Sequence, residues 1–155
     1  MRLSLGLLVT TAMIAIATTG CAADTQDDSE DVEQLGDVGQ QLLAGPRLTP
    51  HEVAALVRRA GFPEYEVGKM VCTARYESSF YERASNRNSN GTIDRGVFQI
   101  NSIWIGASGC PHTATGLYDA DANARCAHAV WREQGNNAWY GYQAHRSTCD
   151  HYPAP

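Results

Sequence analysis

The chain contains 155 residues, of which 43% are hydrophobic, so it can bury the core of one domain of ordinary size. Its formal net charge of −5 is unevenly placed, because residues 22–45 carry seven acidic and no basic side chains, whereas residues 46–155 carry eleven basic and ten acidic ones. A domain with this balance lacks the clustered positive charge of nucleic-acid-binding domains, so we expect no nucleic-acid partner.

Residues 1–20 have the pattern of a signal peptide. Arg2 precedes an apolar stretch over residues 3–17, which has the length of a secretory signal core and is too short for a membrane span. The sequence therefore predicts an exported protein.

This signal ends at Thr18-Thr19-Gly20-Cys21, which resembles the lipobox of bacterial lipoproteins, where the Cys becomes lipidated and N-terminal. Thr18 departs from that pattern, since Leu is usual there, and an ordinary secretory signal cleaved nearby is the alternative. Lipidation of Cys21 would also explain the odd number of cysteines, five. The resemblance, with Ala22 after the Cys, implies an outer-membrane lipoprotein, and otherwise we expect a periplasmic or extracellular protein. Any membrane contact is expected only through this anchor.

The composition of residues 21–45 predicts a tether between the signal and the globular domain. They are acidic and poor in aromatic side chains, so they bury too little apolar surface to fold. We expect residues 46–155 to form one monomeric domain.

Two helices are predicted at the start of this domain. Thr49 and Glu52 have the spacing of a capping box around a first-turn proline, and a helix over residues 50–60 would end at Gly61. A second helix over residues 66–78 repeats apolar side chains at helical spacing: Val67, Met70, Val71 and Ala74.

Glu77 continues the apolar face of the second helix. A carboxyl group on a core-facing stripe loses hydration, which raises its pKa. Position alone fits equally well a solvated glutamate at a fraying helix end.

The sequence pattern of residues 85–101 predicts a β-hairpin. Asn90-Gly91 is a signal for a two-residue hairpin turn, and a regular strand would follow from Thr92. Asp94 then lies in the middle of a strand, where aspartate is disfavoured. This suggests a functional role, although an exposed edge strand would also tolerate the residue.

The rest of the domain predicts a connector, a helix over residues 121–133 and an aromatic cluster around Trp139. Four cysteines lie in the domain, and three pairings are open to them: Cys72, Cys110, Cys126 and Cys149. The histidines show no metal-ligand spacing, so we expect no metal and no cofactor.

The order of motifs resembles the c-type lysozymes over residues 53–149. Cys-x4-Glu-Ser-x-Phe starts at Cys72, and Asn-Arg-Asn-x-x-Gly-Thr-x-Asp-x-Gly-x-x-Gln-Ile-Asn-Ser starts at Asn86. Cys-Ala follows at Cys126 and Asn-Ala-Trp at residues 137–139. The resemblance implies an α+β fold in which a helical lobe and a small antiparallel sheet lobe flank an active-site cleft.

By this resemblance, Glu77 is the general acid and Asp94 the nucleophile or electrostatic partner. The implied substrate-binding residues have several roles. Asn88 and Gln99 are amides around Asp94, Asn101 and Ala138 offer main-chain groups to an N-acetyl group, Trp104 stacks on a sugar, and Trp139 forms the apolar pocket of the acid.

The resemblance also implies the disulfides Cys72–Cys149 and Cys110–Cys126. The family commonly has four bridges, and this sequence retains the cysteines of two. We therefore expect a less cross-linked variant.

The implied function is a muramidase that cleaves the β-1,4 bond between N-acetylmuramic acid and N-acetylglucosamine in peptidoglycan glycan strands. One alternative is a lytic transglycosylase, which works with a single acid, and the Thr-x-Asp-x-Gly context of Asp94 favours the hydrolase. The other is a non-catalytic wall-binding lipoprotein, against which the presence of both carboxyl groups argues.

Overall fold

The structure is a computed structural model that describes residues 44–155. The predicted signal peptide, Cys21 and most of the predicted tether lie outside the described residues. The described elements follow the chain in this order: α2 (Pro50–Ala60), α3 (Glu64–Ser78), β1 (Ser85–Arg87), β2 (Ile93–Arg95), β3 (Ile100–Asn101), the 3-10 helices η1 (Ser102–Trp104) and η2 (Thr115–Tyr118), α4 (Ala120–Gln134), η3 (Gly135–Ala138), α5 (Tyr140–Ala144) and α6 (Arg146–Cys149).

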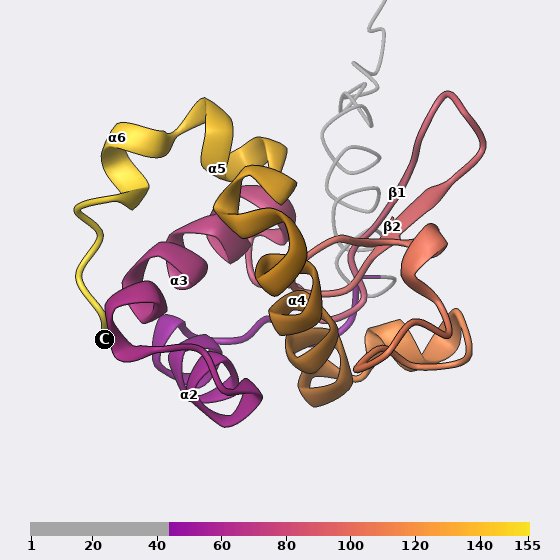
Figure 1. The fold of residues 1–155 in the computed structure, drawn as a ribbon, viewed down its shortest axis with the longest axis horizontal. Coiled ribbons are helices and arrows are strands. Elements are labelled where there is room, and N and C mark those ends of the chain that lie inside the picture. The colour runs from indigo at the N-terminus through magenta and orange to yellow at the C-terminus, as the bar shows by residue number, and fades with distance from the viewer. Residues whose placement is uncertain (1–43) are drawn as a thin grey trace, which may run out of the picture.

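The elements form two lobes that are joined by α4. Helices α2, α3, α5 and α6 gather on one side, the sheet lies on the other, and α4 runs between them (Figure 1). The sheet has the order β1-β2-β3, and both pairs are antiparallel. This arrangement confirms the predicted α+β fold class. Among the described residues, no helix is long and apolar enough to cross a membrane.

Helix α2 has the ends that its sequence predicts. Thr49 accepts a hydrogen bond from the amide of Glu52, whose carboxylate accepts one from the amide of Thr49, so the capping box is complete. Gly61 closes the helix with φ +97°, a conformation that glycine adopts without steric cost.

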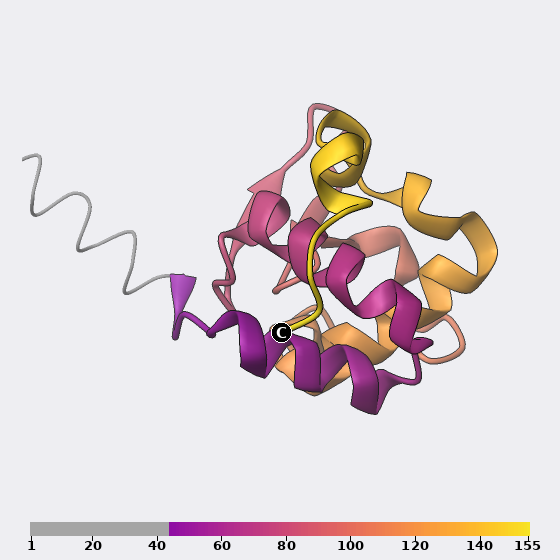
Figure 2. The same cartoon turned by 90° about the vertical axis from the view of Figure 1, so that its left-hand side faces the viewer.

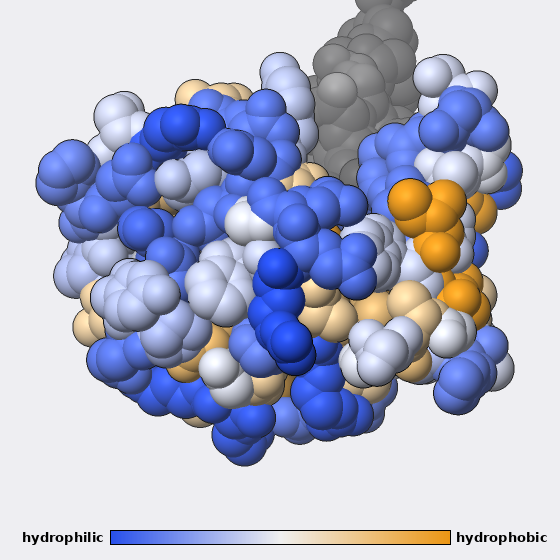
Figure 3. Space-filling view, viewed as in Figure 1, coloured by the Kyte–Doolittle hydropathy of each residue, from blue (hydrophilic) through white to orange (hydrophobic). Residues whose placement is uncertain are grey.

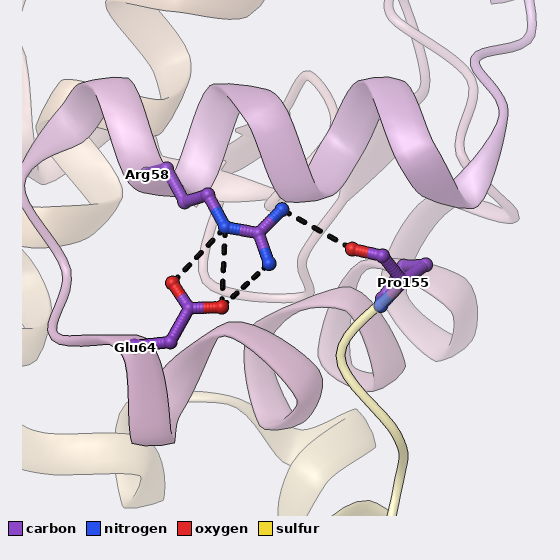
Figure 4. Close-up of polar contacts among 3 residues, drawn as sticks. All are labelled: Arg58, Glu64 and Pro155. Carbon is purple, nitrogen blue, oxygen red and sulfur yellow. Dashed lines mark hydrogen bonds and ion pairs between the residues drawn. The ribbon is translucent and has the colours of Figure 1, made fainter.

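Helix α3 begins at Glu64, two residues before the predicted start, because Pro63 serves as its N-cap in an extended conformation. Glu64 also forms an ion pair with Arg58 of α2, and the same guanidinium donates to the carbonyl of Pro155 at 3.1 Å (Figure 4). The segment that ends at Pro155 crosses α3 and reaches α2 (Figure 2). Gly68 permits this crossing, because a Cβ atom there would overlap the carbonyl of Tyr152.

The prediction of one regular strand over residues 92–101 is wrong. Strands β2 and β3 are separated by a turn over residues 96–99, in which Gly96 has φ +80° and Gln99 has φ +45°. The turn buries Val97 and Phe98 in succession, which a strand with alternating faces cannot do. Core packing of these two neighbours therefore overrides the alternating pattern.

The prediction of a two-residue hairpin turn at Asn90-Gly91 is also wrong. Arg87 pairs with Ile93, which leaves a five-residue loop over residues 88–92. The amide of Asn88 closes this loop on the carbonyl of Thr92 at 2.9 Å. The side-chain oxygen of Asn90 accepts a further bond from the amide of Thr92, so local side-chain bonds replace a tight turn.

Both lobes contribute to one core. Its fully buried members include Val57 of α2, Met70 of α3, Phe98 of the 96–99 turn and Ala127 of α4. Two disulfides add covalent links. Cys72–Cys149 joins α3 to α6 and Cys110–Cys126 joins the connector to α4, the pairing that the family resemblance implies.

Candidate active site

A cleft of about 500 Å³ lies between the two lobes. Its lining comes from the β1–β2 loop, β2, β3 and η1 on the sheet side, and from the end of α3, α4, η3 and α5 on the helical side. The lining residues include all eight that the sequence assigned to catalysis or substrate binding: Glu77, Asn88, Asp94, Gln99, Asn101, Trp104, Ala138 and Trp139. The fold thus brings together side chains from positions 77 to 139 of the chain.

The lining of this cleft is mainly polar. The face in Figure 3 is largely hydrophilic, and its most hydrophobic area lies where the sheet lobe and the connector after it are found in Figure 1. In the same lobe, the side chain of Ile103 is 72% exposed next to Trp104, which lines the cleft. A polar cleft with an aromatic side chain on one wall suits a carbohydrate, which offers hydroxyl groups and flat apolar ring faces.

Glu77 occupies the next-to-last position of α3 and is half-buried. Loss of hydration raises the pKa of its carboxyl group, and the negative charge of Asp94 raises it further. The amide of Gly141 opposes these effects, because it donates a hydrogen bond to Oε1 at 2.7 Å and favours the charged form. The net pKa is raised, so Glu77 retains its proton to a higher pH than an exposed glutamate does.

Asp94 has a different environment in the centre of the sheet. The amide of Asn88 donates to its Oδ2 at 2.9 Å, and the amide of Asn101 donates to its Oδ1 at 2.7 Å. Thr92 Oγ1 accepts a second bond from each of these amides. Both carboxylate oxygens are therefore fixed in direction by side chains that are themselves fixed.

Trp139 is a buried aromatic side chain at the cleft. Its ring is 4% exposed and lines the cleft with Glu77, and its Nε1 donates to the carbonyl of Phe98 at 2.8 Å. An indole held in this way supplies apolar surface beside a carboxyl group without leaving its own N–H unpaired.

Gln99, the second amide expected around Asp94, lines the same cleft, and its side chain bonds to backbone groups. Its Nε2 donates to the carbonyls of Ala84 and Gly96, at 3.0 and 2.9 Å. The positive φ of Gln99 turns its side chain back over the 96–99 turn. Asn101, whose main chain is expected to contact an N-acetyl group, also uses its side chain to hold Asp94.

Two features of the cleft region were not predicted. Tyr140 lines the cleft with a ring that is 81% exposed. Asn123 of α4 is completely buried and bonds to the carbonyl of Arg95 just before the 96–99 turn and to the amide of Phe98 within it. A polar residue within the apolar spacing of the third predicted helix was the available signal for Asn123. Within residues 44–155, no group of three or more His, Cys, Asp or Glu could hold a metal ion.

Comparison with known proteins identifies the family. The model of a lysozyme-like domain matches residues 54–140. Lysozyme C of Ortalis vetula is 38% identical over 108 residues, and lysozyme C of Crax fasciolata is 37% identical over the same length. Each match covers 61% of this chain and 84% of the relative. Lysozyme c-1 of Anopheles gambiae is 33% identical over 101 residues, which are 61% of this chain and 72% of that protein. The chain belongs to the lysozyme-like family.

Proposed function

We propose that this protein is a muramidase, which hydrolyses the β-1,4 bond between N-acetylmuramic acid and N-acetylglucosamine in peptidoglycan. The observation that carries the proposal is the pair of carboxyl groups in one cleft with opposite surroundings. Glu77 has a raised pKa, and Asp94 accepts hydrogen bonds from two amides. Glycoside hydrolysis needs one carboxyl group that is protonated and one that is ionised.

The roles follow the scheme of retaining glycosidases, for which lysozyme is the type case. Protonated Glu77 gives its proton to the glycosidic oxygen while the bond from that oxygen to the anomeric carbon breaks. Asp94 meets the positive charge that develops at the anomeric carbon, from the other face of the sugar. Water then adds to this carbon, and Glu77 takes the proton that the water releases.

The cleft lining supports an extended glycan as substrate. Trp104 offers an aromatic face, and Asn88, Asn101 and the Ala138 backbone add polar groups along the same cleft. The Asn101 side chain is engaged by Asp94, Thr92 and the Ile103 amide, so we expect an N-acetyl group to contact the Asn101 main chain.

Product analysis tests the proposal and separates it from the lytic transglycosylase alternative. The purified full-length protein is incubated with peptidoglycan, and the released muropeptides are analysed by mass spectrometry. We expect products with a reducing end. Anhydro products, lighter by one water, would assign the protein to the transglycosylases and leave Asp94 without a catalytic role. Binding to the wall without any product would favour the non-catalytic alternative.

For the whole chain, we propose an exported enzyme with residues 46–155 as the catalytic domain. The signal-like residues 1–20 and the lipobox-like sequence at Cys21 support export and lipidation, and residues 21–45 then serve as a tether. A Cys21→Ala variant tests the anchor. We expect it to lose incorporation of labelled fatty acid, and equal labelling of both proteins would contradict lipidation.

A further inference from the structure

The 96–99 turn links the two halves of the candidate catalytic machinery in the sheet lobe. Asp94 in β2 lies two residues before it, and Asn101 in β3 lies two residues after it. Val97 and Phe98 within the turn are completely buried. Buried backbone groups must find hydrogen-bond partners, so the partners of this turn determine where it sits.

Asn123 of α4 supplies two of these bonds. Its Nδ2 donates to the carbonyl of Arg95 at 2.9 Å, and its Oδ1 accepts from the amide of Phe98 at 2.8 Å. The second proton of Nδ2 is donated to the carbonyl of Leu117 at 2.8 Å. One side chain with 0% exposure thus bonds to the carbonyl just before the turn and to an amide within it, and ties both to α4.

The remaining bonds from the helical lobe hold only the middle of the turn. Ser78 Oγ donates to the carbonyl of Val97 at 2.7 Å, and Trp139 Nε1 donates to the carbonyl of Phe98. Among these three side chains, Asn123 alone bonds to the carbonyl of Arg95, the residue that directly follows Asp94. Asn123 therefore ties the backbone next to Asp94 to α4.

We propose that Asn123 is a positioning residue for glycoside hydrolysis, which fixes the Arg95 carbonyl and thereby the distance between Asp94 and Glu77. This inference rests on the proposed function. Asn123 is absent from the residues that line the cleft, so it acts through the backbone and does not touch the substrate.

The reaction depends more steeply on this distance than substrate binding does. A displacement of about 1 Å at a reacting group can lower the rate about 100-fold. The sugar contacts of Trp104 and Ala138 come from segments that Asn123 does not hold, so ground-state binding should change little. A positioning role therefore predicts a fall in kcat at nearly constant affinity.

The test compares Asn123→Ala with the wild type in the full-length protein. Wild-type release of reducing ends from peptidoglycan is measured first, because its absence would remove the proposed function and this inference together. With an active wild type, we expect kcat of Asn123→Ala to fall by about 10- to 100-fold. The dissociation constant of the N-acetylglucosamine trimer, measured by calorimetry, should change by less than about twofold.

Thr73→Val is the matched control. Thr73 is also completely buried, and its hydroxyl donates one bond to the carbonyl of Lys69 within α3. The control loses a buried hydrogen bond without affecting the 96–99 turn, and we expect it to retain the wild-type kcat.

Two results would overturn the inference. One is a folded Asn123→Ala protein with kcat within twofold of the wild type, and the other is a parallel loss of kcat and trimer affinity. If Asn123→Ala does not fold, Asn123→Asp replaces it. This variant keeps the acceptor for the Phe98 amide and loses the donor to the Arg95 carbonyl, so the same expected split and the same contradicting results apply.

Discussion

At the scale of single residues, two carboxyl groups differ because of what surrounds them. Glu77 loses water at the end of a buried helix face and accepts a single backbone hydrogen bond from Gly141. Asp94 keeps both oxygens bonded to amides in the sheet. The same functional group can therefore serve as an acid in one place and as an anion in the other.

Glu77→Gln should remove activity and keep the fold, because Gln has nearly the same shape and can still accept the Gly141 bond. We expect kcat to fall by about 10²- to 10⁴-fold, the usual contribution of a general acid. Glu82→Gln is the control, since burial also raises the pKa of Glu82, but this residue does not line the cleft. Turbidity loss of a wall suspension measures both. Retained activity in Glu77→Gln would remove Glu77 from the mechanism.

The raised pKa of Glu77 also predicts how stability changes with pH. In the unfolded chain the carboxyl group titrates near its ordinary value of 4.5, and in the folded protein it titrates at higher pH. Below the unfolded pKa both states are protonated, so the wild type keeps its full stability. As pH rises through the folded pKa, the unfolded state gains more from ionisation, and stability is lost.

Urea denaturation of wild type and Glu77→Gln checks this sign. We expect the wild type to become progressively less stable relative to the variant as pH rises above the ordinary value of 4.5, because the variant has no proton to release at this position. Titrating groups that do not interact with Glu77 are common to both proteins and cancel. A stability difference that does not change with pH would contradict the raised pKa.

At the scale of elements, the 96–99 turn decides how the sheet meets the helices. Gly96 has φ +80° and faces Asn123 and the Leu117 carbonyl so closely that an added Cβ would overlap both. Two separate features require glycine at this position. The backbone has a positive φ, and the neighbouring atoms leave no room for a Cβ atom. The turn can therefore approach α4 closely enough for Asn123 to reach it.

Gly96→Ala and Gly91→Ala separate these two requirements. Gly91 has φ +86°, but a Cβ there would meet nothing within 4 Å. We expect Gly91→Ala to cost about 1 kcal/mol, from backbone strain alone. Gly96→Ala should cost about 1–3 kcal/mol more, because overpacking adds to that strain. Urea denaturation measures both, and equal costs would show that the contact with Asn123 has no energetic weight.

At the scale of the whole molecule, the two disulfides join different distances along the chain. Cys72–Cys149 spans 77 positions and links α6 to α3, whereas Cys110–Cys126 spans 16 positions and links the connector to α4, which follows it in the chain. A longer closed loop removes more conformational entropy from the unfolded chain.

Paired Cys→Ala variants should show this difference. Loop closure predicts a loss of about 4.5 kcal/mol without Cys72–Cys149 and about 3 kcal/mol without Cys110–Cys126. Thermal and urea denaturation of the two double variants give the comparison. A larger loss for the short-range pair would mean that local packing around Cys110 and Cys126, rather than loop closure, governs the cost.

The sequence alone was sufficient for features that depend on near neighbours or on motif order. The α2 capping box, the α4 helix and the α+β fold class follow from spacing and from the resemblance, and the structure confirms them. The choice of Glu77 and Asp94 also came from the sequence. Their chemical roles remain predictions.

Only the tertiary structure decided which distant groups meet. Asn123 bonds to residues 28 and 25 positions away, and the side chain of Asn136 donates to the buried carboxylate of Glu66 across 70 positions. No periodic pattern records such pairs, because each depends on how whole elements pack. The prediction of a regular strand through residues 96–99 was wrong for the same reason. Burial of Val97 and Phe98 against the helices outweighs the local preference for a regular strand.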